Sequence, residues 1–314
     1  MKKRTTYKVL SAVAALLVAA AAVMMFVDDP LPKVRETPEG TVIIAKNTAQ
    51  IQRYFKSVGY DMLPHLKEKK PVPRLFVQSV PSDFNKEKYD EVRPALFYEM
   101  MLPLILKANE TLAAEREQVV TLKKEFDQNG DLTPESMEKL KEWITRYDVK
   151  LSDDLGTLFD TLLPKVDAVT PTLMLAMAAE DSGFGTSRYA REYNSVFHER
   201  DWDGNGIVPD EKQKEGPQYR IKVFPSLYEA VLSRMRYLNT NGYFGNYRIA
   251  RARYRRTDNL MRGYSVAHLL INFPYKTIKY PDIIKHLIVQ YELTPLDSQK
   301  LEPAGSGGEA KVSE

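Results

Sequence analysis

The sequence predicts an α+β protein that is mostly helical, with one small β element. Apolar residues recur at three- and four-residue steps through most segments, the spacing of helices with one buried face. Residues 219–224 alternate between apolar and polar side chains and form the best strand candidate. A hydrophobic fraction of 43% and a charged fraction of 28% are typical of a globular chain with a normal core.

The N-terminus has the pattern of a signal anchor. Residues 1–8 form a basic tip, and residues 9–27 form an apolar run whose only polar member is Ser11. Such a run is long enough to cross a bilayer as a helix, with its positive flank in the cytoplasm. We expect an uncleaved transmembrane helix at 9–27 with the rest of the chain exported. Small residues at 19–22 leave a cleavable signal peptide as the alternative.

The composition excludes several kinds of site. The chain has no cysteine, which excludes disulfides, thiolate zinc sites and a cysteine nucleophile. Its histidines show no ligand spacing, so we expect no metal and no cofactor. The net charge of +3 is mild, and no basic stripe interleaved with aromatic residues argues for nucleic acid. A mildly basic chain suits an anionic polymer such as a bacterial cell wall.

A linker or extension is expected at residues 28–74, because the segment begins with prolines and charges. Within it, residues 49–60 favour a short helix. Residues 72–80 read as an extended segment that crosses the domain.

Residues 75–150 predict a helical hairpin. The first helix contains Pro94 and Pro103, which should kink or split it. A turn at 127–131 leads to a second helix that starts at Pro134.

The main domain is expected at residues 151–295, organised around a nearly apolar helix. Thr170 is expected to cap this helix, and Gly183 to end it. The helix closes on Glu180 and Asp181, and a carboxylate there is costly unless it is paired, hydrated or used. Further helices are expected at 155–163, 227–238, 246–256, 265–271 and 281–293, and a disordered tail at 296–314.

One string resembles a known family. Residues 178–192 read Ala-Ala-Glu-Asp-Ser-Gly-Phe-Gly-Thr-Ser-Arg-Tyr-Ala-Arg-Glu. This is similar to the Ala-Ala-x-Glu-Ser-Gly-Trp-Gly-Thr-Ser-Arg-Phe-Ala-Arg-Glu pattern of Bax-type proteins in the glucosaminidase family, glycoside hydrolase family 73. Further matches follow in order at 206–209, 215–216, 222–226 and 238–240. The likeness covers most of residues 75–295.

The resemblance implies a lysozyme-like glucosaminidase domain, with a small β-lobe beside a cleft that takes a glycan strand. By register, Asp181 stands at the position of the family's general acid, and Glu180 fills the variable position before it. Adjacent helical residues point about 100° apart, so both are not expected to face one cleft. The candidate substrate-binding residues are Phe184, Tyr189, Asn194, Phe197, Trp202, Phe273 and Tyr275. Candidates for a second carboxylate are Asp203, Asp210 and Glu211.

The function that follows is a membrane-anchored peptidoglycan hydrolase, a β-N-acetylglucosaminidase, in which we expect Asp181 to be the general acid. We expect it in the bacterial inner membrane as a single-pass protein with its C-terminal domain in the periplasm. Its expected partners are peptidoglycan glycan strands and, through residues 9–27, the membrane. The alternative is a catalytically impaired protein that keeps the fold and binds or scaffolds the wall.

Overall fold

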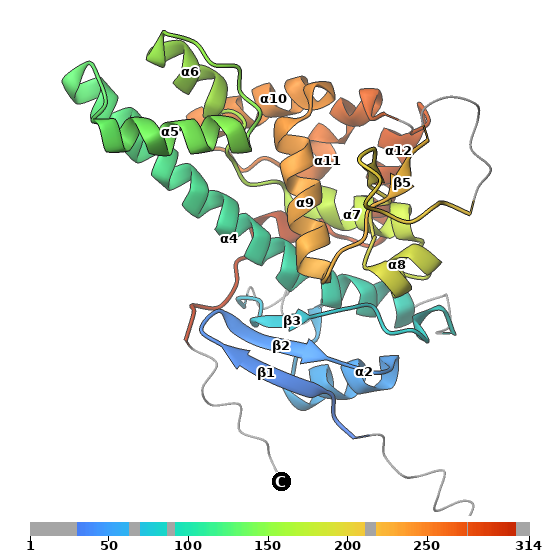
Figure 1. Ribbon diagram of the computed structural model, residues 1–314. Coiled ribbons are helices and arrows are strands. Elements are labelled where there is room, and N and C mark those ends of the chain that lie inside the picture. The colour runs from blue at the N-terminus through green and yellow to red at the C-terminus, as the bar shows by residue number, and fades with distance from the viewer. Residues whose placement is uncertain (1–29, 63–69, 87–91, 211–217, 275, 306–314) are drawn as a thin grey trace, which may run out of the picture. The chain divides into compact units, whose positions relative to one another are not determined.

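The structure is a computed structural model that describes residues 30–62, 70–86, 92–210, 218–274 and 276–305. Pro32–Glu314 form one compact unit. This unit is mostly helical, as expected, and it has two small sheets where one small β element was expected (Figure 1). The expected transmembrane segment at 9–27 lies outside the described residues. Among the described residues, no helix has the length and apolar character needed to cross a membrane.

A three-stranded sheet forms where the linker was expected. Strand β1 (Lys33–Thr37) pairs antiparallel with β2 (Gly40–Ile44), and β2 pairs parallel with β3 (Leu75–Val77). Helix α2 (Thr48–Ser57) lies between β2 and β3 in the chain, which confirms the short helix expected at 49–60. Gly40 has a φ of +136°, and a Cβ there would lie 2.5 Å from the Cβ of Arg74. Residues 33–57 therefore form strands and a helix instead of a linker, and they bury apolar residues such as Ile43, Ile51 and Phe55.

Helix α4 (Val92–Asn129) is not split, although the sequence predicted that Pro94 and Pro103 would kink or split it. A proline inside a helix leaves the carbonyl four residues earlier without its N–H donor. That carbonyl belongs to Glu99, and the hydroxyl of Tyr60 donates to it at 3.2 Å. The hydroxyl from outside the helix therefore replaces the missing donor.

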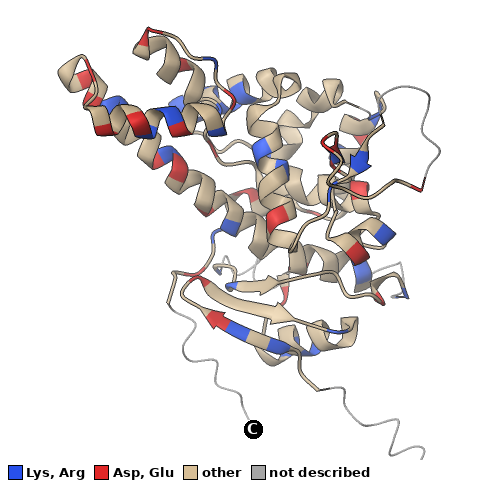
Figure 2. Cartoon of the chain, in the orientation of Figure 1, with Lys and Arg blue, Asp and Glu red and all other residues tan. Residues whose placement is uncertain are grey.

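The predicted helical hairpin is confirmed. Helix α4 is followed by α5 (Pro134–Arg146), capped by Thr133, and by α6 (Leu155–Leu162). These three share their own apolar cluster, which includes Leu140, Trp143 and Phe159. Helices α5 and α6 lie at the opposite end of the unit from the sheet (Figure 1), and acidic and basic residues intermingle along α4 and α5 (Figure 2). Neither charge dominates that surface.

Helix α7 (Pro171–Ser182) is the centre of the main core, and Glu180 is its one exposed residue. It packs against α4 and against α12 (Tyr280–Gln290). Gly183 ends it in the left-handed conformation, as predicted, with a φ of +58°. The predicted cap was wrong: Thr170 makes no capping hydrogen bond, and Asp297 accepts from the backbone N–H of Thr172 at 3.0 Å instead.

The remaining elements surround α7. They are α8 (Arg188–Tyr193), β4 (Arg200–Asp201), β5 (Arg220–Ile221), α9 (Leu227–Thr240), α10 (Gly245–Arg256) and α11 (Gly263–Val266). Short 3-10 turns occur at Phe84–Lys86, Gly242–Phe244, Ala267–Asn272 and Thr294–Ser298. The strand expected over 219–224 is reduced to β5, which pairs antiparallel with β4. This two-stranded ribbon is the small β element of the main domain.

Residues 296–302 are ordered, in contrast to the tail expected over 296–314. Leu296 and Leu301 are buried. Val72 exchanges backbone hydrogen bonds with the segment, donating to Lys300 and accepting from Glu302. The chain end is thereby joined to the segment that leads into β3, and residues 306–314 lie outside the described part.

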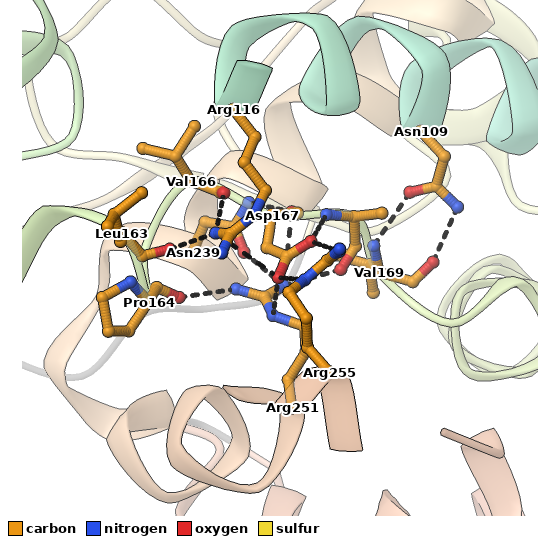
Figure 3. A network of polar contacts seen from close by, with 11 residues as sticks. Asn109, Arg116, Leu163, Pro164, Val166, Asp167, Val169, Asn239, Arg251 and Arg255 are labelled. Atoms are coloured by element: carbon orange, nitrogen blue, oxygen red, sulfur yellow. Dashed lines mark hydrogen bonds and ion pairs between the residues drawn. The ribbon is translucent and has the colours of Figure 1, made fainter. Parts of the chain in front are cut away.

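A polar network fixes α10 to the segment before α7 (Figure 3). The carboxylate of Asp167, with a side chain 3% exposed, accepts from Arg255 Nε at 2.8 Å. Arg251 donates to the backbone carbonyls of Pro164 and Ala168 at 2.9 and 2.8 Å. Asn109 pairs with both backbone groups of Val169. These bonds set where α7 begins and therefore where its C-terminal carboxylates lie.

Candidate active site

The two carboxylates at the end of α7 face different surroundings. Asp181 has a fully buried side chain, whereas Glu180 is exposed. Neighbouring residues on a helix point about 100° apart, so this divergence is what the sequence predicted. The two groups therefore have different environments.

Two side chains donate hydrogen bonds to Asp181. One belongs to the segment before α12, and the other belongs to the first residue of α12. Lys276 Nζ donates to Asp181 Oδ1 at 2.5 Å, and the hydroxyl of Tyr280 donates to the same oxygen at 3.0 Å. Burial and the negative charge of Asp181 raise the pKa of Tyr280 well above its usual range, so this hydroxyl keeps its proton. Asp181 Oδ2 has no hydrogen-bond partner among the described residues.

Glu180 holds its proton more strongly than an ordinary glutamate. Partial burial raises its pKa, the charge of Asp181 raises it further, and the ammonium of Lys276 opposes both. A carboxyl with a raised pKa at an exposed position is suited to donate a proton.

A pocket of about 420 Å³ opens beside this helix end. Its aromatic walls come from α8, the β4–β5 ribbon, α9 and the segment that precedes α12. The rings are those of Tyr189, Phe197, Trp202, Tyr219, Tyr237, Tyr243 and Phe273. Lys276 lines the pocket and also binds Asp181, so it connects the pocket to the end of α7. Asp181 and Glu180 are not among the lining residues.

The β4–β5 ribbon supplies an exposed aromatic pair at the pocket. Trp202 is 50% exposed, and its ring centroid lies 5.8 Å from that of Tyr219. The guanidinium of Arg200 lies 3.9 Å from the centre of the Tyr219 ring. Flat, amphipathic rings at a pocket edge provide apolar area together with a polar tip.

One carboxylate lines the pocket itself, and it is Glu199. Its Oε2 accepts from the hydroxyl of Ser233 at 2.8 Å and lies 3.4 Å from Lys222 Nζ. Its Oε1 lies 3.5 Å from Arg234 Nε. The side chains of Glu199 and Arg234 are only 4% and 3% exposed.

The structure brings four of the expected substrate-binding residues together. Tyr189, Phe197, Trp202 and Phe273 all line the pocket. Tyr275 lies outside the described residues.

Phe184 and Asn194 do not line the pocket. The turn after α7 gives Phe184 a φ of +55° and directs its ring into the core, 5.8 Å from Tyr98 and 5.4 Å from Tyr291. The expectation that this ring meets a sugar is therefore wrong in the structure, because the side chain is 6% exposed. Asn194 ends α8 in the left-handed conformation and donates to the carbonyl of Phe224 at 3.0 Å, which is a structural role.

Two of the candidates for a second carboxylate, Asp203 and Asp210, are not among the residues that line the pocket. Asp203 is exposed, and Asp210 forms a two-pronged ion pair with Arg188. Glu211 lies outside the described residues.

Glu199 and Arg234 were missed, although the sequence carries a signal for each. From Phe197 to Asp201 burial alternates, so Glu199 lies on the buried face of an extended segment. Arg234 falls on the helical stripe that includes Leu227, Val231 and Leu238, and a charge on an apolar stripe needs a partner. Within the described part of the chain, no group of three or more His, Asp or Glu side chains could hold a metal ion.

Comparison with known proteins indicates the class of protein to which the chain is similar. Residues 161–293, which include every described residue that lines the pocket, match the glucosaminidase family model, described as mannosyl-glycoprotein endo-beta-N-acetylglucosaminidase. The chain is also similar to protein Bax of Escherichia coli (strain K12), with 28% identity over 220 residues that cover 70% of this chain and 74% of Bax. No solved structure matched it significantly. Residues 161–293 therefore match the glucosaminidase family, and the chain is similar to a Bax-type protein, as the string at 178–192 predicted.

Proposed function

We propose that this protein is a peptidoglycan hydrolase that cleaves glycan strands at N-acetylglucosamine. The observation that carries the proposal is the aromatic-lined pocket of about 420 Å³, formed by residues inside the family match. Aromatic faces suit the apolar faces of sugar rings, and Glu199, Lys222 and Arg234 supply polar groups among them. A helical lobe around α7 and a small β-lobe at β4–β5 would then form a lysozyme-like cleft.

In this proposal Glu180 donates the proton to the leaving oxygen. Glycosidases need a carboxyl that stays protonated at working pH, and pairs of carboxylates often acquire separate roles from separate environments. Glu180 has the raised pKa and the exposure, whereas Asp181 is buried against Lys276. Asp181 then contributes a negative charge that, together with partial burial, raises the pKa of Glu180.

Digestion of purified sacculi, with analysis of the released fragments, tests the proposal. The wild-type protein should release fragments with N-acetylglucosamine reducing ends. Glu180→Gln should lower the rate by about 10²- to 10⁴-fold, the usual contribution of a general acid. The matched control is Glu229→Gln, an exposed residue on α9. Loss of activity in Asp181→Asn, with Glu180→Gln unaffected, would instead assign the proton to Asp181.

Asp181→Asn also has a directional effect on the pH profile. Removing its charge lowers the pKa of Glu180, because that charge opposes ionisation of its neighbour. The alkaline limb of the kcat/KM profile should therefore move to lower pH. An unmoved limb contradicts the assignment of Glu180 as the donor.

A second candidate function is binding without cleavage. The observation that favours it is the ion pair between Lys276 and Asp181, since Asp181 stands at the family's acid position and is engaged by a cation. Such a protein would bind or scaffold the wall through the same pocket. Sedimentation of the protein with sacculi, without release of reducing ends, would support this function over hydrolysis.

We also propose that residues 9–27 anchor the protein in the bacterial inner membrane, with the pocket in the periplasm. The support is the basic tip at 1–8 followed by an apolar run of bilayer length. Protease added to spheroplasts should degrade the domain, and washing with carbonate should leave the chain in the membrane fraction. Release by carbonate would contradict the anchor.

A further inference from the structure

The floor of the pocket contains a buried carboxylate and a buried guanidinium that are incompletely bonded. Glu199 Oε1 and Arg234 Nε lie 3.5 Å apart. Neither atom has a hydrogen-bond partner within the described part of the chain. Buried polar atoms are nearly always satisfied in folded proteins, so an exception needs an explanation. Both residues line the pocket, which points to a ligand as the missing partner.

The other atoms of the two side chains are fixed. Glu199 Oε2 accepts from Ser233 at 2.8 Å, and Arg234 Nη2 donates to the carbonyl of Phe197 at 2.6 Å. The guanidinium also lies 5.2 to 5.4 Å from the ring centres of Phe197, Phe273 and Tyr237. A pair that is already held in place loses little conformational entropy when it binds a ligand.

Glu199 Oε1 and Arg234 Nε, which form an ion pair with each other but accept or donate no hydrogen bond among the described residues, define the chemistry of the ligand group. One is an acceptor and the other a donor, and a hydroxyl is the small neutral group that donates and accepts through one oxygen. A ligand carboxylate would be repelled by Glu199, and a ligand ammonium by Arg234. Lys222, the remaining neighbour, has a side chain 41% exposed and a long contact of 3.4 Å with Glu199, so it is able to move aside.

We propose that Glu199 and Arg234 together bind one hydroxyl group of a glycan residue in the pocket. The hydroxyl donates to Glu199 Oε1, and Arg234 Nε donates to the hydroxyl oxygen. Glu199 is then a specificity-determining residue, separate from the proton donor on α7. This inference rests on the proposed function, because that function supplies the glycan.

Calorimetric binding of the N-acetylglucosamine tetramer to the full-length chain is the first test. Glu199→Gln should weaken binding by about 10- to 100-fold, because a hydrogen bond to a charged group is lost. Glu229→Gln, an exposed glutamate to glutamine change on α9, should bind like the wild type. Thermal melting of each variant shows that the comparison is made between folded proteins.

Ligand analogues test the same contact without changing the protein. Among tetramers that lack one hydroxyl in turn, one should bind the wild type with the same loss as Glu199→Gln produces. That analogue should lose no further affinity for Glu199→Gln, because both changes remove one contact. If every analogue binds the wild type within about threefold of the parent, a loss of under 1 kcal/mol, the inference is overturned.

The outcomes separate this inference from the function beneath it. A wild-type protein that does not bind the tetramer overturns both. A wild-type protein that binds, together with Glu199→Gln that binds equally well, overturns the hydroxyl contact and leaves the proposed function in place.

Discussion

Asp167 and Glu199 are both buried carboxylates beside arginines, yet their surroundings differ. Both oxygens of Asp167 accept hydrogen bonds, from the backbone N–H of Ala168 and from Arg255 (Figure 3). Glu199 has one oxygen bound by Ser233 and one without a hydrogen bond among the described residues. Because both oxygens of Asp167 are hydrogen-bonded within the protein, its network stabilises the fold. Glu199 has, at a pocket, an oxygen without a hydrogen bond from the described residues, and that oxygen is able to bind a ligand. Burial of a charge alone does not distinguish these two purposes.

The largest expected effect is on stability and comes from removing Asp167 from its network. Asp167→Ala should lower the free energy of unfolding by about 3–5 kcal/mol, because it leaves buried guanidinium groups without their counter-charge. Arg251, with a side chain 5% exposed, is the group most affected. Denaturant unfolding measures the change, with the exposed Asp203→Asn as the matched control. A loss in the free energy of unfolding below about 1 kcal/mol would mean that the Asp167 network contributes little to stability.

A third carboxylate, that of the partly buried Glu99, sharpens the comparison, because its bound oxygen has a backbone donor. Glu99 accepts from the N–H of Met62 at 3.2 Å, and burial raises its pKa from 4.5 to about 7. The folded protein therefore binds a proton there that the unfolded chain releases between pH 4.5 and 7.

The sign of the pH effect follows from that raised pKa. Stability is greatest below the unfolded pKa and falls as the pH rises toward about 7, by about 3 kcal/mol in all. Unfolding followed at pH 4.5 and pH 8 measures the change. Glu99→Gln should remove this part of the pH dependence, and Glu142→Gln, at an exposed position, should retain it. Equal pH dependence in both variants would contradict the role given to Glu99.

The smallest expected effect concerns the pocket edge. Trp202 is half exposed, so Trp202→Ala should change the free energy of unfolding by less than about 0.5 kcal/mol. Loss of a ring that packs on a sugar should weaken binding of the tetramer by about tenfold, or 1.4 kcal/mol. Leu151→Ala is the control, because Leu151 is 76% exposed and lies outside the pocket lining. Unchanged binding would remove Trp202 from the ligand-contacting set.

Much of the helical architecture could be predicted from sequence because the signals are local. The start of α5 at Pro134 and the glycine exit of α7 each depend on a few neighbouring residues. The failures involve distant partners. Tyr60, from outside α4, replaces the hydrogen-bond donor that Pro103 lacks. Asp297, which caps α7, lies 125 residues later in the sequence than Thr172, from whose N–H it accepts a hydrogen bond.

The candidate site was likewise predicted only in part from the sequence. Tyr189, Phe197, Trp202 and Phe273 were predicted and line one pocket. Phe184 was predicted too, but a positive φ turns its ring into the core. The string at 178–192 could name the family, yet not the environment of each side chain in it.

The sequence by itself determined the helical class, the family, and the divergence of Glu180 from Asp181. Each of these depends on residue order and on the fixed 100° step of a helix. Tertiary structure alone decided that Lys276 binds Asp181 and that Glu199 lies on the pocket wall. The reason is that pairing of buried charges depends on which distant segments pack together, and neither periodicity nor spacing carries that information.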